Sequence, residues 1–284
     1  MSRPLVIGPP PADAEALLGT AERAARAAGA MLLERFAGGA DAIGQVYSKS
    51  TSTDLVSEAD MAAERAIRAI LAEERPDDAV MGEEGDDTPG TSGRRWIVDP
   101  LDGTINYLYG LSAWCVSVAC EGLAGVVFDP LSGELFASPV TAGAPATCNG
   151  APIAGRGVSE LGQSLLGTGF GYDREIRAAQ APIVAGLLPE VRDVRRIGSA
   201  ALDLAWCASG RLDAYYEFGV KPWDIAAGVL LCAASGLEVH ELAGGPVLPS
   251  GILVAPPAIA GELVARVEPP DSAAPDVRSE PTSP

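Results

Sequence analysis

The chain has 284 residues, of which 48% are hydrophobic, and this is enough to fill the core of one large or two modest domains. Its net charge of −18 disfavours nucleic acid as a partner, because proteins bind phosphodiester backbones chiefly through Lys and Arg. No apolar run approaches the ~20 residues that a membrane span needs, and the N-terminus lacks the features of an export signal, so we expect a cytoplasmic protein that does not enter a membrane.

The first half of the chain predicts two helices followed by strands. Apolar residues recur at a spacing of three to four over residues 13–37, and a pair of glycines ends the pattern. A second helix is predicted to begin near Ser57 and Asp60, which have the spacing of a capping box, and to end at Glu74. The segment RWIVDPLD is predicted to be a buried strand, and three further apolar segments separated by turn signals predict an antiparallel meander.

Beyond about residue 148, helical and extended patterns alternate, which favours an α/β layer. The polar, proline-rich end of the chain predicts disorder. The expected organisation is a flexible N-terminus over 1–12, an N-terminal α+β half over 13–148, a C-terminal α/β half over 149–268 and a disordered tail over 269–284.

Five acidic residues have positions that ordinary structural roles explain one at a time. They are Glu83 and Glu84 in VMGEEG, Asp99 and Asp102 in VDPLDGT, and Asp224 in KPWDIAAG. The glutamates are typical of solvated loop charge, an acid at a helix start complements the helix dipole, and Asp beside Pro and Gly is typical of turns. The aspartates of DPLDGT favour a different interpretation, because Asp99 ends a buried strand, where α/β enzymes commonly place reactive groups.

The DPLDGT segment has the composition of a cation and phosphate site. The proline after Asp99 fixes the turn, and we expect it to direct Asp99, the Leu101 carbonyl and Asp102 into one cavity. Such oxygen ligands suit Mg²⁺, which is often shared with a substrate phosphate. Gly103 lets the backbone approach an anion, and the N–H groups of Gly103 and Thr104 are suited to bind it if a helix or turn begins there.

The charge of the acidic residues also favours bound cations. Glu83, Asp99, Asp102 and Asp224 sum to four negative charges, and carboxylates close together protonate unless cations intervene. Two Mg²⁺ ions balance this charge, and a third offsets the charge of a phosphate monoester. A metal that activates water replaces a histidine base, and we expect the only histidine, His240, to be structural.

The motifs GEE, WIVDPLDGTINY and WDIAAG, in this order and at these separations, resemble those of the inositol monophosphatase family of Mg²⁺-dependent, lithium-sensitive phosphatases. The resemblance covers about residues 13–265 and includes KSTSTDLVSEAD and RRIGSAALDLAWCASGRLDAYYE. It implies a layered α-β-α-β-α sandwich of the sugar-phosphatase type, an α+β and α/β architecture, and a homodimer. The implied reaction is hydrolysis of a small phosphate monoester, most readily myo-inositol 1-phosphate, to the alcohol and phosphate.

The resemblance also implies residue roles, with two Mg²⁺ sites that share one aspartate and a third, weaker ion near Glu83. The implied ligands are Glu83, Asp99 and the Leu101 carbonyl for the first ion, and Asp99, Asp102 and Asp224 for the second. Thr104, oriented by Asp60, is implied to work with Glu83 in positioning a metal-bound water for attack on phosphorus. The implied substrate contacts are Asp102, Gly103, Thr104, Gly198, Ser199, Ala200 and Glu217. Lys49 matches a family lysine near Asp60, with an isolated surface lysine as the alternative.

Two kinds of alternative stay open. Sister phosphatases act on histidinol phosphate, fructose 1,6-bisphosphate or 3′-phosphoadenosine 5′-phosphate, although Glu217 favours a polyol because a carboxylate accepts ring hydroxyls and repels a second phosphate. A regulatory protein that binds the transcription machinery is the alternative from another class. The segment GTGFGY, 167–172, lacks the spacing of a dinucleotide-binding loop and is interpreted as a turn. Arg195 and Arg196 are interpreted as contacts to substrate or a partner subunit, or as an exposed strand end.

Overall fold

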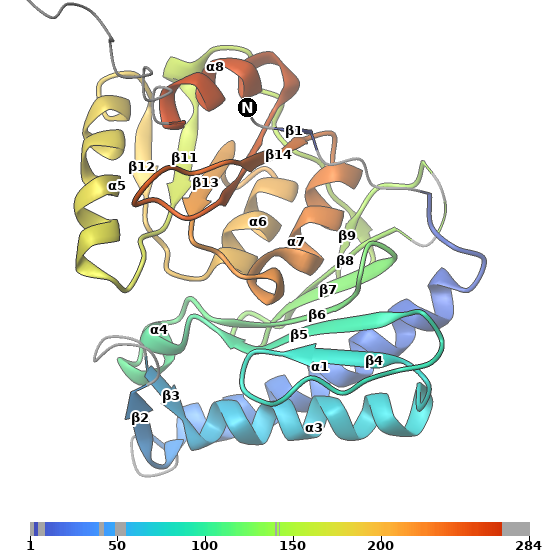
Figure 1. Cartoon of the computed structure of the whole chain (residues 1–284). Coiled ribbons are helices and arrows are strands. Elements are labelled where there is room, and N and C mark those ends of the chain that lie inside the picture. Colours follow the sequence, from blue (N-terminus) through green and yellow to red (C-terminus); the bar gives the residue numbers. More distant parts are fainter. Residues whose placement is uncertain are drawn as a thin grey trace, which may run out of the picture.

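The computed structural model describes residues 3–4, 9–39, 43–48, 55–139, 141 and 143–268. Two sheets alternate with three layers of helices (Figure 1). The predicted layered α-β-α-β-α sandwich is therefore confirmed. The predicted tail, 269–284, and Lys49 lie outside the described residues. Within the described ranges, no helix is both long and apolar enough to cross a membrane.

The outer helical layer consists of α1 (Ala14–Ala37) and α3 (Glu58–Glu74), which cover one face of the larger sheet (Figure 1). α1 buries a stripe of alanines together with Leu17 and Leu32, and these small side chains let it pack closely on its neighbours. α3 begins with the predicted capping box, in which Asp60 accepts the Ser57 N–H at 2.9 Å. The bounds of both helices agree with the sequence prediction to within one residue at each end.

The larger sheet contains the end of β5 that bears the DPLDGT motif. Its strands, in spatial order, are β10 (Ala151–Pro152), β9 (Thr147–Cys148), β8 (Glu134–Ala137), β7 (Ala124–Asp129), β6 (Cys115–Cys120), β5 (Arg95–Asp102) and β4 (Ala79–Gly82). The predicted meander is present as β6, β7 and β8, which are antiparallel. The pairing of β5 with β6 is irregular between Asp99 and Asp102. Residues three apart on a regular strand face opposite sides, so this irregularity is what lets both carboxylates face one cavity.

The second half supplies the middle helical layer and the smaller sheet. α6 (Ala200–Ala208) and α7 (Pro222–Ala234) lie between the two sheets, and α5 (Arg174–Leu187) and α8 (Pro257–Val267) cover the far side (Figure 1). The strands of the smaller sheet, in spatial order, are β1 (Arg3–Pro4), β14 (Glu238–Leu242), β15 (Gly251–Ala255), β13 (Ala214–Phe218), β11 (Leu165–Thr168) and β12 (Asp193–Arg195). Short elements complete the description: the hairpin β2 (Val46–Ser48) and β3 (Leu55–Ser57), α4 (Thr104–Leu108) and η1 (Leu161–Gln163).

Two sequence interpretations differ from the structure in detail. Within the segment 1–12, for which flexibility is predicted, Arg3–Pro4 form β1 and pair with β14. GTGFGY is not wholly a turn, because Gly167 and Thr168 belong to β11, which is parallel to both β12 and β13. His240, which is expected to be structural, lies on β14 with its Nε2 atom 2.9 Å from Glu238.

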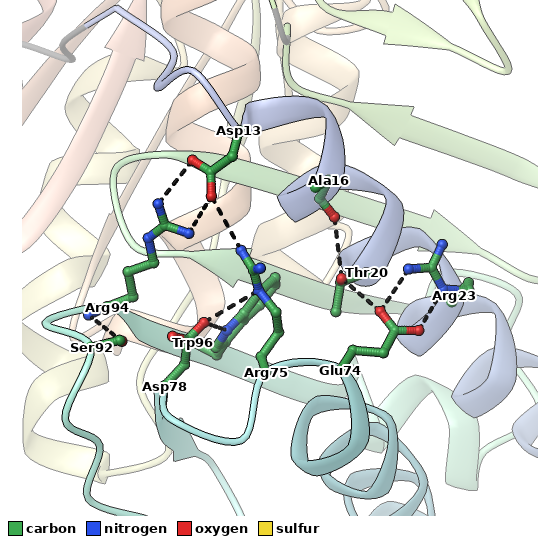
Figure 2. A network of polar contacts seen from close by, with 10 residues as sticks. All are labelled: Asp13, Ala16, Thr20, Arg23, Glu74, Arg75, Asp78, Ser92, Arg94 and Trp96. Carbon is green, nitrogen blue, oxygen red and sulfur yellow. Dashed lines mark hydrogen bonds and ion pairs between the residues drawn. The ribbon is translucent and has the colours of Figure 1, made fainter.

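A polar network joins the start of α1 to the end of α3 and to β5 (Figure 2). Arg94 donates two hydrogen bonds to the Asp13 carboxylate, one of them at 2.8 Å. The Arg75 guanidinium lies 3.5 Å from Asp13 and 3.4 Å from Asp78. The indole N–H of the buried Trp96 donates to Asp78 at 2.9 Å. The network therefore fixes the outer helices to the strand that ends in the acidic motif.

Candidate metal centre and active site

Three carboxylates from the two halves of the chain meet at one end of a cavity. Oxygen atoms of Asp99, Asp102 and Asp224 all lie within 4.8 Å of one another. Asp99 and Asp102 belong to the end of β5, and Asp224 is the third residue of α7. Oxygens at this separation are close enough to share a cation, because metal–oxygen distances are about 2.0–2.6 Å. The predicted convergence of acids from both halves is thus present in the structure.

Each of these carboxylates has one oxygen tied to a backbone N–H. The donors to Asp99, Asp102 and Asp224 are, in that order, Leu101 at 3.0 Å, Ala201 at 2.7 Å and Lys221 at 2.6 Å. Hydrogen bonds of this kind fix the direction in which the second oxygen of each carboxylate points.

Asp102 also joins the two halves of the molecule. The Ser199 hydroxyl donates to Asp102 Oδ2 at 2.6 Å, and the same oxygen accepts the N–H of Ala201 in the first turn of α6. A carboxylate at a helix N-terminus is stabilised by the unpaired N–H groups there. Ser199 is itself the N-cap of α6 and is only 1% exposed, so its hydroxyl contacts Asp102 and is not part of the cavity wall.

The acids are held in surroundings that disfavour their charged forms. Burial holds the pKa of Asp99 well above its usual range, and the charges of Glu83 and Asp102 raise it further. Burial also raises the pKa of Asp102 to about 6, although the hydrogen bond from Ser199 opposes this shift. The pKa of Asp224 is raised well above its usual value by burial and then by the charge of Asp102. A divalent cation would balance the negative charges that burial and mutual repulsion disfavour here. A buried cluster of oxygen donors of this kind therefore fits a hard cation such as Mg²⁺.

A hydroxyl group lies beside the acid cluster. Thr104 begins α4, and its Oγ atom lies 2.9 Å from Asp60 Oδ1 and 3.0 Å from the Leu101 carbonyl oxygen. The other oxygen of Asp60 accepts the Ser57 hydroxyl at 2.5 Å, so the capping box of α3 also orients the threonine. Gly103 has a φ of +93°, and a Cβ at this position would lie 2.8 Å from the Ala113 carbonyl, so only glycine fits this turn.

The cavity has a volume of about 420 Å³ and includes most of the residues singled out in the sequence. The predicted residues in its wall are Glu83, Asp99, Leu101, Asp102, Gly103, Thr104, Gly198, Ala200, Glu217 and Asp224. Asp60 contacts the site through Thr104. Wall residues that were not assigned a role from the sequence include Phe170, Tyr172, Lys221 and Trp223. Arg196 also lines the cavity, whereas Arg195 is exposed and pairs with Asp193, so the two adjacent arginines have different surroundings.

Gly169 of the GTGFGY segment makes room for Glu217 in the cavity wall, and Gly167 makes room for Asp203. A Cβ at Gly169 would lie 1.9 Å from Glu217 Oε2, and one at Gly167 would lie 3.2 Å from the buried carboxylate of Asp203. Burial raises the pKa of Glu217 to about 7, and the Tyr215 hydroxyl, which donates to its carboxylate, opposes the shift. The signal in the sequence was the pair of glycines at the end of β11, one within the strand and one just after it, because glycine there is typical of close approach by a neighbouring group.

Comparison with known proteins gives a consistent picture. Residues 13–269 match the model of the inositol monophosphatase family. Inositol-1-monophosphatase SuhB of Mycobacterium tuberculosis is 44% identical over 242 residues, which cover 80% of this chain and 83% of the relative. Nus factor SuhB of Escherichia coli is 37% identical over 235 residues, which cover 81% of this chain and 86% of the relative.

Solved structures agree with these relatives. The extragenic suppressor protein suhB from Bartonella henselae superimposes with a TM-score of 0.81 at 31% identity, over 89% of this chain and 98% of that one. Mycobacterium tuberculosis SuhB superimposes with a TM-score of 0.75 at 38% identity, over 90% of this chain and 97% of that one.

Proposed function

Because this chain belongs to the inositol monophosphatase family, we propose that it is a Mg²⁺-dependent phosphatase that hydrolyses a small phosphate monoester, most readily myo-inositol 1-phosphate, to the alcohol and phosphate. The proposal depends above all on one observation, which is that oxygens of Asp99, Asp102 and Asp224 lie within 4.8 Å of one another. Acids that served only in turns and helix caps would not need to lie close together, because their mutual repulsion is unfavourable.

The proposed ligands of two Mg²⁺ ions are Glu83, Asp99 and the Leu101 carbonyl for one, and Asp99, Asp102 and Asp224 for the other, with a third, weaker ion near Glu83. When bound, Mg²⁺ supplies a Lewis acid and lowers the pKa of water. The Thr104 hydroxyl donates to Asp60 at 2.9 Å, so its oxygen is able to accept a hydrogen bond from the attacking water. Together with Glu83, which also lines the cavity, it is suited to orient that water. We assign the phosphate to the backbone N–H groups of Gly103 and Thr104.

The proposed alcohol site lies at the Glu217 end of the cavity. We assign ring hydroxyls to the Glu217 carboxylate, to the backbone at Gly198 and Ala200, and to Asp102. Ser199 serves this site indirectly, by holding Asp102. A carboxylate at the far end favours a polyol over a substrate with a second phosphate, because it accepts hydroxyl donors and repels another anion.

A substrate panel tests this choice against the sister activities. We expect kcat/KM with Mg²⁺ to be highest for myo-inositol 1-phosphate and lower for histidinol phosphate, fructose 1,6-bisphosphate and 3′-phosphoadenosine 5′-phosphate. If inositol phosphate is the poorest of these substrates by about tenfold, a difference of about 1.4 kcal/mol in transition-state binding, the assignment of a polyol is wrong.

The metal assignment has its own test in Asp99→Asn. The amide cannot supply the negative charge that the ion needs, so we expect hydrolysis to fall by at least about a hundredfold. Asp129→Asn is the matched control, because Asp129 is also a buried aspartate at a strand end but caps the turn at Leu131 instead of facing the cavity. Unchanged turnover in Asp99→Asn, or an equal loss in both variants, would contradict the assignment.

A regulatory protein that binds the transcription machinery is the second candidate. It is favoured by relatives named Nus factor SuhB, among them one from Xylella fastidiosa that is 42% identical over 227 residues, which cover 78% of this chain and 80% of the relative. A pull-down with RNA polymerase tests it, and Asp99→Asn shows whether binding needs the acid cluster. Retention of polymerase by a chain that hydrolyses no phosphate monoester would favour this candidate over the phosphatase.

We also propose a cytoplasmic homodimer that binds neither nucleic acid nor membrane. The net charge of −18 supports the lack of nucleic-acid binding, because the chain repels phosphodiester backbones. Size-exclusion chromatography with light scattering is expected to give twice the mass of one chain. A monomer at working enzyme concentrations would contradict the dimer without affecting the assignment of the reaction.

A further inference from the structure

Glu64 is a buried carboxylate that the proposed reaction does not use directly. It lies on α3, one helical turn after Asp60, and is 3% exposed. Its two oxygens accept the backbone N–H groups of Glu84 at 2.8 Å and Gly85 at 2.9 Å. The guanidinium of Arg68, one turn further along α3, donates to the same carboxylate at 2.7 Å. Glu64 therefore binds the backbone of the loop that contains Glu83.

The glycines of the GEEG sequence fit closely around this carboxylate. A Cβ at Gly82 would lie 2.6 Å from Glu64 oxygens, and one at Gly85 would lie 2.7 Å from Oε1. Neither glycine has a positive φ, so their backbone conformations are open to any residue. Both positions therefore require glycine because a side chain at either one would clash with the Glu64 carboxylate, around which the loop folds.

This contact holds the backbone immediately after Glu83. Glu83 stands between the two glycines, lines the cavity and raises the pKa of Asp99 through its charge. Asp60, on the preceding turn of the same helix, holds Thr104. One face of α3 thus holds two separate parts of the candidate site, the threonine hydroxyl and the Glu83 loop.

We propose that Glu64 is a positioning residue that holds the 82–85 loop so that Glu83 faces the acid cluster and completes its metal site. The proposal rests on the proposed function of that site as a Mg²⁺ centre. Carboxylates hydrogen-bonded to two N–H groups and a guanidinium are directional anchors, and loss of such supporting contacts commonly weakens metal affinity by about 10–100-fold.

Glu64→Gln is the test, with Glu73→Gln as the control. Gln keeps the size of the side chain but replaces one accepting oxygen with a donor, which faces an N–H group of the loop. Glu73 is an exposed residue of the same helix, so the control makes the same chemical change without touching the loop. We expect Glu64→Gln to raise the dissociation constant for Mn²⁺, measured on the metal-free protein by electron paramagnetic resonance, by about 10–100-fold, and Glu73→Gln to leave it within about twofold.

A second variant reaches the same contact from the loop. Gly85→Ala places a methyl group against Glu64 Oε1, so it is expected to weaken Mn²⁺ binding as Glu64→Gln does. Because both changes break one contact, the double variant should lose much less affinity than the sum of the single effects. Additive losses, or Mn²⁺ affinity within about twofold of wild type in a folded Glu64→Gln, would overturn the proposal.

Kinetics separates this proposal from the function on which it rests. We expect Glu64→Gln to need a higher Mg²⁺ concentration for half-maximal turnover, with a KM for substrate close to that of the wild type at saturating Mg²⁺. A wild-type chain that binds Mn²⁺ tightly but hydrolyses no phosphate monoester would refute the proposed function and leave the role of Glu64 in metal binding intact. An equal loss of turnover at every Mg²⁺ concentration would refute the role of Glu64 alone.

Discussion

Replacement of Asp102 by Asn is expected to stabilise the metal-free protein at neutral pH. Burial raises the pKa of Asp102 from 3.8 to about 6. The folded chain therefore binds this proton more tightly than the unfolded chain, and the stability that results is complete below about pH 4 and is lost as the pH rises to about 6. A shift of about two units at about 1.4 kcal/mol per unit corresponds to about 3 kcal/mol of lost stability above that range.

The contacts of Asp102 make Asn a clean substitution. One oxygen of Asp102 accepts both the Ser199 hydroxyl and the Ala201 N–H, and the amide oxygen of Asn can accept the same two donors. The second oxygen, which faces the acid cluster, becomes an uncharged amide nitrogen. The variant thus keeps the contact with α6, loses the charge and gains an amide N–H₂ donor in place of the second oxygen.

Thermal melting over a range of pH measures the effect. In EDTA near neutral pH, Asp102→Asn is expected to melt about 6–12 °C above the wild type, since about 1 kcal/mol corresponds to about 2–4 °C in a domain of this size. The two curves should converge below about pH 4, where Asp102 is protonated. Mg²⁺ at about a hundred times its dissociation constant stabilises the wild type by about 2.7 kcal/mol, and this gain should be much smaller in the variant.

The control is Asp129→Asn, which removes a buried carboxylate outside the cavity and is not expected to raise the melting temperature. A metal-free Asp102→Asn that melts below the wild type at neutral pH would refute the reasoning. So would a difference between the two proteins that does not shrink on acidification, because the argument attributes it to the ionised carboxylate.

Three further changes test other parts of the site and its support. Thr104→Val removes the hydroxyl and should lower kcat at saturating Mg²⁺ by about 10²–10⁴-fold, whereas Thr104→Ser should keep most of the activity. Gly169→Ala places a Cβ 1.9 Å from Glu217 and should raise KM by about tenfold with a smaller change in kcat, and an unchanged KM would remove Glu217 from the substrate site. Asp78→Ala leaves the indole N–H of Trp96 without its partner and should lower stability to denaturant by about 1–3 kcal/mol, with kcat/KM unchanged.

The local signals in the sequence predicted most of the N-terminal half. The capping box of Ser57 and Asp60 was visible because both residues lie within one turn, and α3 begins where it predicts. The β5 strand was visible as a continuous apolar run ending in Asp99. The irregular pairing after Asp99 was not visible, since strand alternation by itself separates Asp99 from Asp102.

Contacts between distant segments account for what the sequence did not predict. The resemblance implies that Ser199 contacts the substrate, and the sequence had no sign that its hydroxyl also donates to Asp102, which is 97 residues away in the chain. No local pattern marks Glu64, whose carboxylate accepts the N–H of Glu84, 20 residues further on. The glycine at 169 is explained only by Glu217 on the neighbouring strand. Such constraints arise from the packing of one element on another and have no local pattern.

The backbone donors that hold Asp99, Asp102 and Asp224 have a consequence for the thermodynamics of the site. Because these side chains are immobilised when the chain folds, the entropy of arranging them is lost before any ion arrives. Ion affinity is then coupled to the integrity of the first turns of α6 and α7. Fraying of either turn releases a ligand, so amide exchange at Ala201 and Lys221 should report loss of the ion earlier than exchange in the outer helices.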